Sequence, residues 1–334
     1  MMKKEFKNLE EKIKELKKRR SAIILVHNYQ LPEVQDVADF RGDSLELSRK
    51  ASQTEAKVII FCGVHFMAET ASILCPDKKV IMPDIHSGCP MANMITAEQL
   101  RKLKREHPKA IAVGYVNTSA EVKAELDVCC TSTNAIAVVN ALVKDSALGG
   151  SLPDRQAGAF CAGGASALGR GGKEEIIFVP DKYLADYASK QTGRKLISWN
   201  GYCPTHIKIL PEDIKREKKF HPFAKVMVHP ECLPQVVTLA DAVLSTSKMC
   251  QFARETEAKE IIVGTEVGLI YRLKKDNPTK EFYPASEGAV CPNMKRTTQE
   301  KIFWALEELK EEVRVSDKIR LRAKKAIDRM LEIV

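Results

Sequence analysis

A chain of 334 residues with 44% hydrophobic content is long enough to form two or three domains with substantial cores. It has no apolar run near the roughly 18 residues that a membrane span needs, and its charged N-terminal segment lacks a signal-peptide core, so we expect a soluble, cytoplasmic protein with no membrane partner. The net charge of +9 comes from basic residues in amphipathic segments, which we expect to be solvated helix faces. The aromatic residues (6% of the chain) do not alternate with them, so nucleic-acid binding is poorly supported, and a positive field that attracts small anionic substrates fits the charge equally well.

The N-terminal part of the chain predicts an alternation of helices and strands. A charged helix comes first, and it is followed by apolar, β-branched runs that are separated by amphipathic segments. The expected strands lie at residues 21–26, 57–63 and 78–84, with helices at 33–38 and 45–56 between the first two. Short apolar runs joined by crossover helices are typical of a parallel sheet.

The same pattern occurs three times. Residues 24–45, 112–133 and 226–247 align with one another, and each places a histidine or tyrosine 17 residues before a serine or threonine. Such an internal repeat determines the architecture more strongly than any local assignment. We therefore predict an α/β fold with three repeated doubly wound parallel-sheet domains arranged with pseudo-threefold symmetry around a common centre. The expected domains are residues 1–96, 97–208 and 209–296.

Two segments do not fit the repeat. The second unit is lengthened by residues 146–172, which hold eight of the 17 glycines and have neither helical nor strand periodicity. We expect them to form a flexible surface insertion. Residues 297–334 have the periodicity of amphipathic helices. Because a helix precedes the first strand of each unit, we expect these helices to pack on the first domain and to close a ring.

A Cys-Pro pair occurs at an equivalent place in each unit. Cys89 and Cys291 each lie 62 residues after the histidine that ends the first strand, and the insertion delays Cys203 to 88 residues after the corresponding tyrosine. Loops at equivalent strand ends would bring the three thiolates to one metal site with an open position. Zinc and an iron–sulfur cluster both suit such ligands. Cys75 precedes a proline but has no counterpart, and the remaining cysteines are expected to be small buried hydrophobic side chains.

The first strand of each unit ends in two polar or titratable side chains that are separated by one residue. Residues two apart in a strand lie on the same face, and ligands of parallel sheets bind beyond the carboxyl ends of the strands. We therefore expect these pairs to face the same centre as the cysteines. The pairs are His27 and Tyr29, Tyr115 and Asn117, and His229 and Glu231.

A hydroxyl residue stands in the loop before the next long helix of each unit. Ser44, Ser132 and Thr246 are expected at the N-cap position, where they would cap the helix. At least some of these hydroxyls, with the neighbouring helix N-termini, could also bind a carboxylate or phosphate. One aspartate per unit is expected to be structural and to fix the turn from helix to strand. These aspartates are Asp39, Asp127 and Asp241.

Nearly the whole chain resembles the quinolinate synthase family. The matching motifs are HNYQLPEVQDVADFRGDS, GCPMANM, VGYVNTSAEVKAE, CTSTNA, GYCPTH, HPEC, LADAVLSTS and CPNMK. The resemblance implies a [4Fe–4S] cluster held by Cys89, Cys203 and Cys291. It also implies the condensation of iminoaspartate with dihydroxyacetone phosphate to quinolinate, phosphate and two waters. An iron without a cysteine ligand would act as the Lewis acid for dehydration.

The resemblance further implies roles for individual side chains. Tyr115 and Glu231 are expected to transfer protons, assisted by Tyr29 and His206. The expected substrate-binding residues are His27, Ser44, Tyr115, Asn117, Ser132, His229, Glu231 and Thr246. An enzyme that produces iminoaspartate would be the natural protein partner.

Two other functions are compatible with the residues. A zinc-dependent hydrolase would use His206, His229 and Glu231 together with the cysteines. A basic nucleic-acid-binding protein would not need the cysteines, and its affinity would depend steeply on salt.

Overall fold

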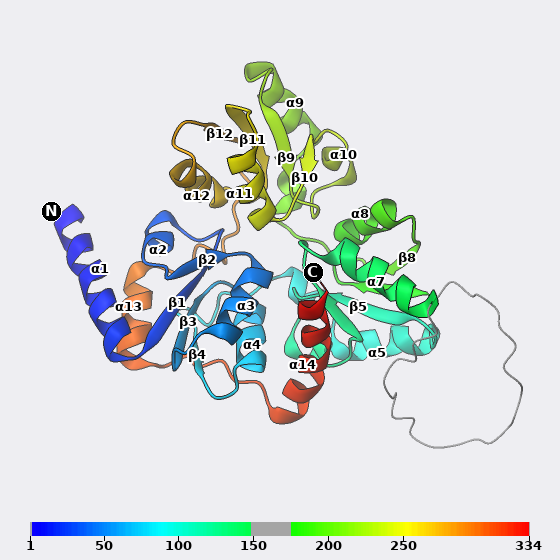
Figure 1. Ribbon diagram of the computed structural model, residues 1–334, viewed down its shortest axis with the longest axis horizontal. Helices are drawn as coiled ribbons and strands as arrows, with labels where there is room; N and C mark the ends of the chain where they lie inside the picture. Colours follow the sequence, from blue (N-terminus) through cyan, green and yellow to red (C-terminus); the bar gives the residue numbers. More distant parts are fainter. Residues whose placement is uncertain (1, 148–174, 334) are drawn as a thin grey trace, which may run out of the picture.

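The computed structural model describes residues 2–147 and 175–333, which form three parallel four-stranded sheets. All three sheets have the same strand order: the first strand of the unit lies between the second and the third, and the fourth lies at the edge beyond the third. Figure 1 shows the three units as separate lobes around a common centre. The predicted α/β fold of three repeated doubly wound parallel-sheet units is confirmed.

The α-helices and strands follow one another in the same order in each unit, and the short helices η1 and η2 end the first two. The first unit contains α1 (Met2–Arg19), β1 (Ala22–His27), α2 (Pro32–Asp36), β2 (Phe40–Gly42), α3 (Ser44–Gln53), β3 (Val58–Cys62), α4 (His65–Leu74), β4 (Lys79–Ile81) and η1 (Met91–Asn93). The second contains α5 (Ala97–Glu106), β5 (Ile111–Tyr115), α6 (Ala120–Lys123), β6 (Val128–Cys130), α7 (Ala135–Ala147), β7 (Ile176–Val179), α8 (Lys182–Thr192), β8 (Leu196–Ser198) and η2 (His206–Lys208). The third contains α9 (Pro211–Phe220), β9 (Lys225–Val228), α10 (Pro234–Val237), β10 (Ala242–Val243), α11 (Thr246–Glu255), β11 (Glu260–Gly264), α12 (Leu269–Asp276) and β12 (Glu281–Pro284). Helices α13 (Gln299–Glu308) and α14 (Asp317–Glu332) end the chain.

The central strand β1 shows how an apolar run builds a core on both faces of its sheet. Leu25 packs in the hydrophobic cluster that contains Ala51 of α3 and side chains of α4. Its neighbours Ile24 and Val26 pack on the other face with Ile13 of α1 and with side chains of α13. Successive side chains of a strand point to opposite faces, so a continuous apolar sequence is what a sheet covered by helices on both sides requires.

The three aspartates expected to be structural make the same contacts in every unit. The carboxylates of Asp39, Asp127 and Asp241 each accept a hydrogen bond of 2.8 Å from a backbone N–H near the start of the unit's first strand. The backbone N–H of each aspartate donates to the carbonyl oxygen of that same strand residue. Each aspartate therefore fixes the end of a short helix beside the first strand, as predicted.

The two C-terminal helices do not share one location. Helix α13 packs against α1 on the first unit, where Ile302 and Leu306 join the cluster that contains Ile13. Helix α14 packs mainly against β6 and α6 of the second unit and also touches α4 of the first. Asn134 Nδ2 donates to the carbonyl oxygen of Met330 at 3.1 Å. The expectation that both helices pack on the first domain is therefore wrong for α14, which spans the first and second units (Figure 1).

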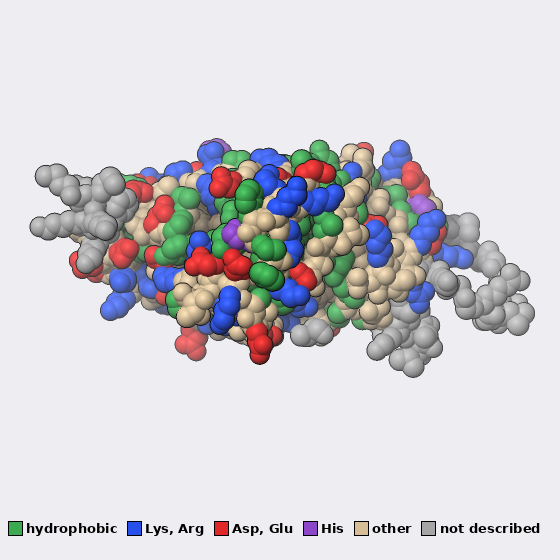
Figure 2. Space-filling model, turned by 90° about the horizontal axis from the view of Figure 1, so that it is seen from above, with side chains coloured by type: hydrophobic (Ala, Val, Ile, Leu, Met, Phe, Trp, Pro, Cys, Tyr) green, Lys and Arg blue, Asp and Glu red, His purple; other side chains and the backbone are tan. Residues whose placement is uncertain are grey.

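The predicted insertion at residues 146–172 lies almost entirely outside the described residues, because α7 continues to Ala147 and the description resumes at residue 175. On the face drawn in Figure 2, the described basic and acidic side chains are interspersed. The excess of positive charge does not gather there into one broad patch. Among the described residues, no helix is both long enough and apolar enough to cross a membrane.

Candidate functional site

A cavity of about 210 Å³ lies where the three units meet. All the predicted site residues line it, although they come from segments that are far apart in the sequence. They are His27, Tyr29, Ser44, Cys89, Tyr115, Asn117, Ser132, Cys203, His206, His229, Glu231, Thr246 and Cys291. The carboxyl ends of parallel strands lie at one edge of each sheet, so one centre collects the strand-end residues of all three units.

The first strands deliver their residues in equivalent ways. His27 and Tyr115 are the last residues of β1 and β5, and His229 directly follows the last residue of β9. Val26 and Gly114, the residues before the first two, lie inside the sheets and pair with neighbouring strands. The repeat therefore places these three side chains at rigid strand ends, where positions are well determined.

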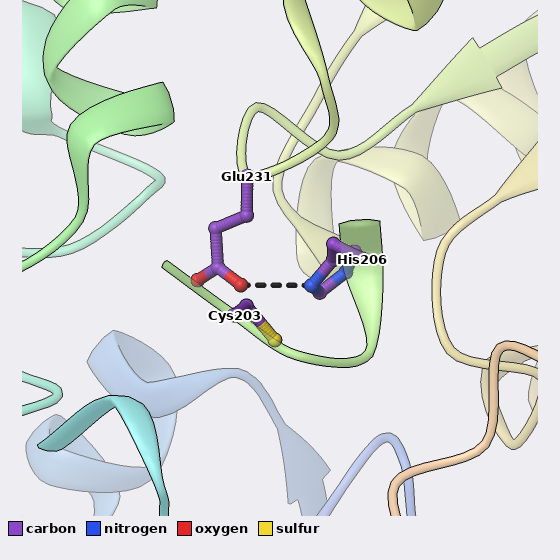
Figure 3. Close-up of side chains that lie close together, drawn as sticks. All are labelled: Cys203, His206 and Glu231. Carbon is purple, nitrogen blue, oxygen red and sulfur yellow. Dashed lines mark ion pairs between the residues drawn. The ribbon is translucent and has the colours of Figure 1, made fainter. Parts of the chain in front are cut away.

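Glu231 is at the centre of the polar contacts in the cavity, and its side chain is only 4% exposed. The Tyr115 hydroxyl donates to Glu231 Oε1 at 2.5 Å. His206 Nδ1 lies 2.8 Å from Glu231 Oε2, an ion-pair distance without the alignment of a hydrogen bond. Figure 3 shows the carboxylate reaching from the loop after β9 toward His206, with Cys203 beside both. The ring of His229 stacks on that of His206, with centroids 4.6 Å apart.

Burial sets the protonation states of the histidines and of Tyr115 in the site, whereas neighbouring groups set that of Glu231. It lowers the pKa of His27 to about 3 and that of His229 to about 3, so both rings are neutral at pH 7. Burial raises the pKa of Tyr115 well above its ordinary value, and the Glu231 carboxylate raises it further. Burial acts to raise the pKa of Glu231 as well, but the His206 ring beside it and the Tyr115 hydroxyl that donates to it outweigh that effect and hold the pKa below its ordinary value. The site thus holds a protonated phenol against a carboxylate.

Tyr29 occupies the first unit's share of this network. Its hydroxyl lies 2.6 Å from Thr265 Oγ1 and 3.4 Å from His206 Nε2. His206 Nε2 is also 2.9 Å from Thr265 Oγ1. Burial raises the pKa of Tyr29 well above its ordinary value, and the Glu231 charge adds to the effect. Tyr29 and His206, predicted to assist proton transfer, are therefore connected to each other and through His206 to Glu231.

The three Cys-Pro cysteines are half-buried free thiols, and each comes from a different unit. Burial raises the pKa of Cys89 to about 12 and also raises the pKa values of Cys203 and Cys291. Cys75 does not line the cavity; its Sγ lies 3.1 Å from the carbonyl oxygen of Ala51. The other described cysteines are buried, as expected for small hydrophobic side chains, while Cys161 lies outside the described residues.

Among the described residues, Cys203, His206 and Glu231 form a group that could hold a metal ion. One ligand atom from each lies within 4.8 Å of the other two, and His206 and Glu231 are buried. Thiolate, imidazole and carboxylate are all ligands for transition metals. A metal needs the thiolate, so binding would have to displace the proton that burial favours on Cys203. The thiols of Cys89 and Cys291 line the same cavity.

The hydroxyl residues lie at the cavity, but the N-cap prediction is wrong. Asp43 is the N-cap of α3, and its Oδ1 accepts from the backbone N–H groups of Leu45 and Glu46. Ser245 caps α11, so Ser44 and Thr246 are the first residues of their helices. Ser132 lies three residues before α7 begins. Because residues one position earlier cap two of the helices, the hydroxyls of Ser44 and Thr246 are not engaged as caps.

Ser132, Thr246 and Asn117 are further polar residues that line the cavity. Ser132 Oγ lies 3.2 Å from His229 Nε2, and Thr246 Oγ1 accepts from Asn28 Nδ2 at 2.9 Å. Asn117 Oδ1 is buried and has no hydrogen-bond partner among the described residues. A buried amide oxygen without a partner is costly, and at a cavity wall a bound ligand can satisfy it.

Glu266, Lys208 and Asp43 also line the cavity, and sequence analysis missed them. Glu266 could have been found, because it lies two residues beyond the end of β11, and the same strand-end rule was applied only to the first strand of each unit. Lys208 is exposed and belongs to the short helix η2. No spacing in the repeat indicates it.

Comparison with known proteins identifies the family. The family described as "Quinolinate synthetase A protein" matches residues 11–169 and 165–332. The chain belongs to this family. It is 52% identical over 323 residues to the quinolinate synthase of Dehalococcoides mccartyi strain CBDB1, with 97% of each chain covered. Quinolinate synthases of Thermodesulfovibrio yellowstonii and Methanosarcina barkeri are 51% and 48% identical to it, again over 97% of this chain and 98% and 97% of theirs.

The quinolinate synthetase A family consists of enzymes, and the alignment with the Dehalococcoides mccartyi relative covers 97% of each chain. The cavity described above is the place where its three repeated units bring polar and thiol side chains together. The site residues are therefore best interpreted as parts of one enzyme centre.

Proposed function

We propose that this chain is a quinolinate synthase that condenses iminoaspartate with dihydroxyacetone phosphate to quinolinate, phosphate and two waters, in the biosynthesis of NAD. The observation that carries the proposal is the meeting of three thiols, one from each unit, in the same cavity as the Tyr115–Glu231 pair. The relatives' names support the reaction. The cavity volume of about 210 Å³ suits small substrates.

A [4Fe–4S] cluster is the cofactor proposed for this cavity, held by Cys89, Cys203 and Cys291. The donor set fits, because three free thiols line one cavity. The three sulfurs do not form a group within 4.8 Å among the described residues. A single ion bound by all three sulfurs would need them closer together, whereas in a cluster each thiolate would bind a different iron. When bound, the cluster would supply a Lewis-acidic iron for removal of hydroxyl groups.

The protein's own acid and base would be Tyr115 and Glu231. Tyr115 holds its proton at neutral pH and donates it toward Glu231 Oε1 at 2.5 Å. Glu231 is ionised and able to accept a proton from a substrate carbon or nitrogen. His206 lies against the second carboxylate oxygen and would orient it, and Tyr29 would extend the network toward the first unit. These contacts support proton transfer during isomerisation and ring closure.

Both proposed substrates are anions, and the cavity offers them neutral donors. The rings of His27 and His229 are neutral and carry one N–H each. The hydroxyls of Ser44, Ser132 and Thr246 add donors from the three units. Ser44 begins helix α3, and because the Asp43 carboxylate already accepts the backbone N–H groups of Leu45 and Glu46, the Ser44 hydroxyl is the donor proposed for this helix start. Asn117 would use its amide to orient the substrate.

The test combines metal content with product formation. Anaerobically purified chain is expected to contain iron and sulfide and to form quinolinate from dihydroxyacetone phosphate and enzymatically generated iminoaspartate. The variants Cys89→Ser, Cys203→Ser and Cys291→Ser should each lose the cluster's absorption and the activity. Cys75→Ser is the matched control, since Cys75 precedes a proline but lies away from the cavity. Loss of iron in the control, or full activity in the other three, would refute the ligand assignment.

A single-metal enzyme remains a second candidate because Cys203, His206 and Glu231 alone could hold one ion. A zinc-dependent hydrolase would use these residues, with His229 beside them. Elemental analysis separates the two functions. Zinc in place of iron and sulfide, together with activity that survives Cys89→Ser, would favour the hydrolase.

The remaining predictions concern the location of the enzyme, its partners and its domain limits. We propose a cytoplasmic enzyme that receives iminoaspartate from the enzyme that produces it, and that acts on small molecules without nucleic acid or membrane partners. The domain limits 1–96, 97–208 and 209–296 stay predictions. Activity measured with and without an iminoaspartate-producing enzyme present in equimolar amounts tests the partner.

A further inference from the structure

Glu266 is a fully buried carboxylate that the proposed chemistry does not use. It lies two residues beyond β11 and lines the cavity. Its Oε1 accepts the backbone N–H of Cys291 at 3.0 Å, and its Oε2 accepts the backbone N–H of Gly268 at 2.8 Å. A buried carboxylate is retained only where hydrogen bonds or an opposite charge compensate its lost hydration. Here its hydrogen bonds hold the loop that carries a cavity cysteine.

The compensating charge is Lys295, four residues beyond Cys291. Its Nζ lies 2.9 Å from Glu266 Oε1, and its side chain is 19% exposed. The same Nζ donates to the backbone carbonyl oxygen of Tyr29 in the first unit. The pair therefore connects the Cys291 loop of the third unit to the strand-end loop that carries Tyr29.

The backbone beside this pair is closely packed. A Cβ atom at Gly268 would lie 2.6 Å from Lys295 Nζ, 2.6 Å from the carbonyl oxygen of Tyr29 and 2.8 Å from Glu266 Oε2. All three distances are shorter than van der Waals contact allows, so only glycine fits between the groups. The ion pair and the interunit contact thus depend on one compact arrangement.

The repeat shows that this arrangement is specific to the third unit. The position two residues beyond the third strand holds Val64 in the first unit and Asp181 in the second. Val64 has no polar side-chain group. Asp181 is fully buried, and its Oδ1 accepts from the backbone N–H groups at the start of α8. The backbone of Cys203 also interacts with Asp181, so the feature that distinguishes Glu266 among these three positions is its ion pair with Lys295, which contacts another unit.

We propose that Glu266 and Lys295 are positioning residues: together they fix the Cys291 thiol and the Tyr29 loop relative to each other at the site. The proposal rests on the function proposed above only in treating Cys291 as a cluster ligand. Outer partners of metal ligands typically change metal affinity or activity by about 10- to 100-fold when they are removed. Loss of the pair should therefore loosen the Cys291 loop and speed loss of the cluster.

The test uses the anaerobically purified full-length chain with Glu266→Gln and Lys295→Gln. Glu287→Gln is the matched control, because it removes a carboxylate from the same loop at an exposed position. Hydrogen exchange of the segment 288–295 should be faster in both variants and unchanged in the control. Iron release to a chelator should be about 10- to 100-fold faster in both variants. The cluster's reduction potential should rise in Glu266→Gln, because removal of a nearby negative charge favours the reduced state.

The outcomes separate this proposal from the proposed function. Exchange of segment 288–295 at the wild-type rate in both variants would overturn the positioning role, whatever the metal content. Faster exchange with unchanged iron release would overturn its importance for the cluster. Wild-type chain that holds iron and sulfide but forms no quinolinate would refute the function and leave iron release to decide on the pair. If Glu266→Gln fails to fold, Lys295→Gln decides, since Lys295 is partly exposed.

Discussion

Replacement of Tyr115 by phenylalanine tests the proposed acid–base pair most directly. The change removes one oxygen atom, which is buried and donates to the ionised Glu231 at 2.5 Å. Hydrogen bonds to charged groups contribute about 1.5–3 kcal/mol, so the free energy of unfolding should fall by about that amount. A positioned general acid contributes about 10²- to 10⁴-fold to the rate. We expect kcat for quinolinate formation to fall by a factor in that range.

The assay measures kcat and KM with dihydroxyacetone phosphate and enzymatically generated iminoaspartate, alongside urea unfolding. Tyr271→Phe is the matched control, because the Tyr271 hydroxyl donates to the Asp36 carboxylate at 2.6 Å on the protein surface. It should leave kcat unchanged. If Tyr115→Phe retains kcat within about threefold while losing stability, the hydroxyl is structural and the proposed proton transfer through it is wrong.

Three further changes test other parts of the site. Stability should fall as the pH drops from 6.5 toward 3, because the unfolded chain protonates His229 near its ordinary pKa, whereas burial lowers the pKa in the folded chain to about 3. The loss is up to about 1.4 kcal/mol per pH unit, and His229→Asn should reduce the slope of the urea unfolding free energy against pH. Asn117→Asp should raise KM for the anionic substrates by about tenfold or more, since it places a negative charge at the cavity wall where the amide oxygen has no partner among the described residues. An unchanged KM would mean that the substrates bind elsewhere. Asp43→Ala should lower the free energy of unfolding by about 0.5–2 kcal/mol through loss of the α3 cap. Ser44→Ala should change the free energy of unfolding by no more than about 0.5 kcal/mol but lower the activity, and equal stability losses in the two variants would contradict the assignment of the cap.

Some features of the site were predictable because the repeat carries them. The spacing between strand ends, cysteines and hydroxyl residues is constant wherever the intervening elements have the same lengths, so alignment of the three units already placed Cys89 and Cys291 together. Parallel strands all direct their carboxyl ends to the same side. For that reason the sequence alone predicted the three sheets and most of the polar and thiol side chains that line the cavity, although not Asp43, Lys208 or Glu266.

Other features depended on contacts between units, which no spacing encodes. The hydrogen bond from Tyr115 to Glu231 joins the second unit to the third, and Lys295 joins the third unit to the first. Helix α14 packs mainly against β6 and α6 of the second unit, where its apolar side chains are buried, although its place in the sequence suggested the first unit. The N-caps are Asp43 and Ser245, one residue before the predicted Ser44 and Thr246, because the local backbone geometry decides at which residue a helix begins.

The sequence by itself determined the triplicated α/β architecture and most of the polar and thiol residues at its centre, because hydrophobic periodicity and repeat spacing are properties of the chain. Only the tertiary structure decided which of those residues touch. Contacts such as that between His206 and Glu231 depend on the relative placement of units, which the packing of many side chains determines together. Burial in that packing also sets the protonation states of the histidines, the tyrosines and the thiols.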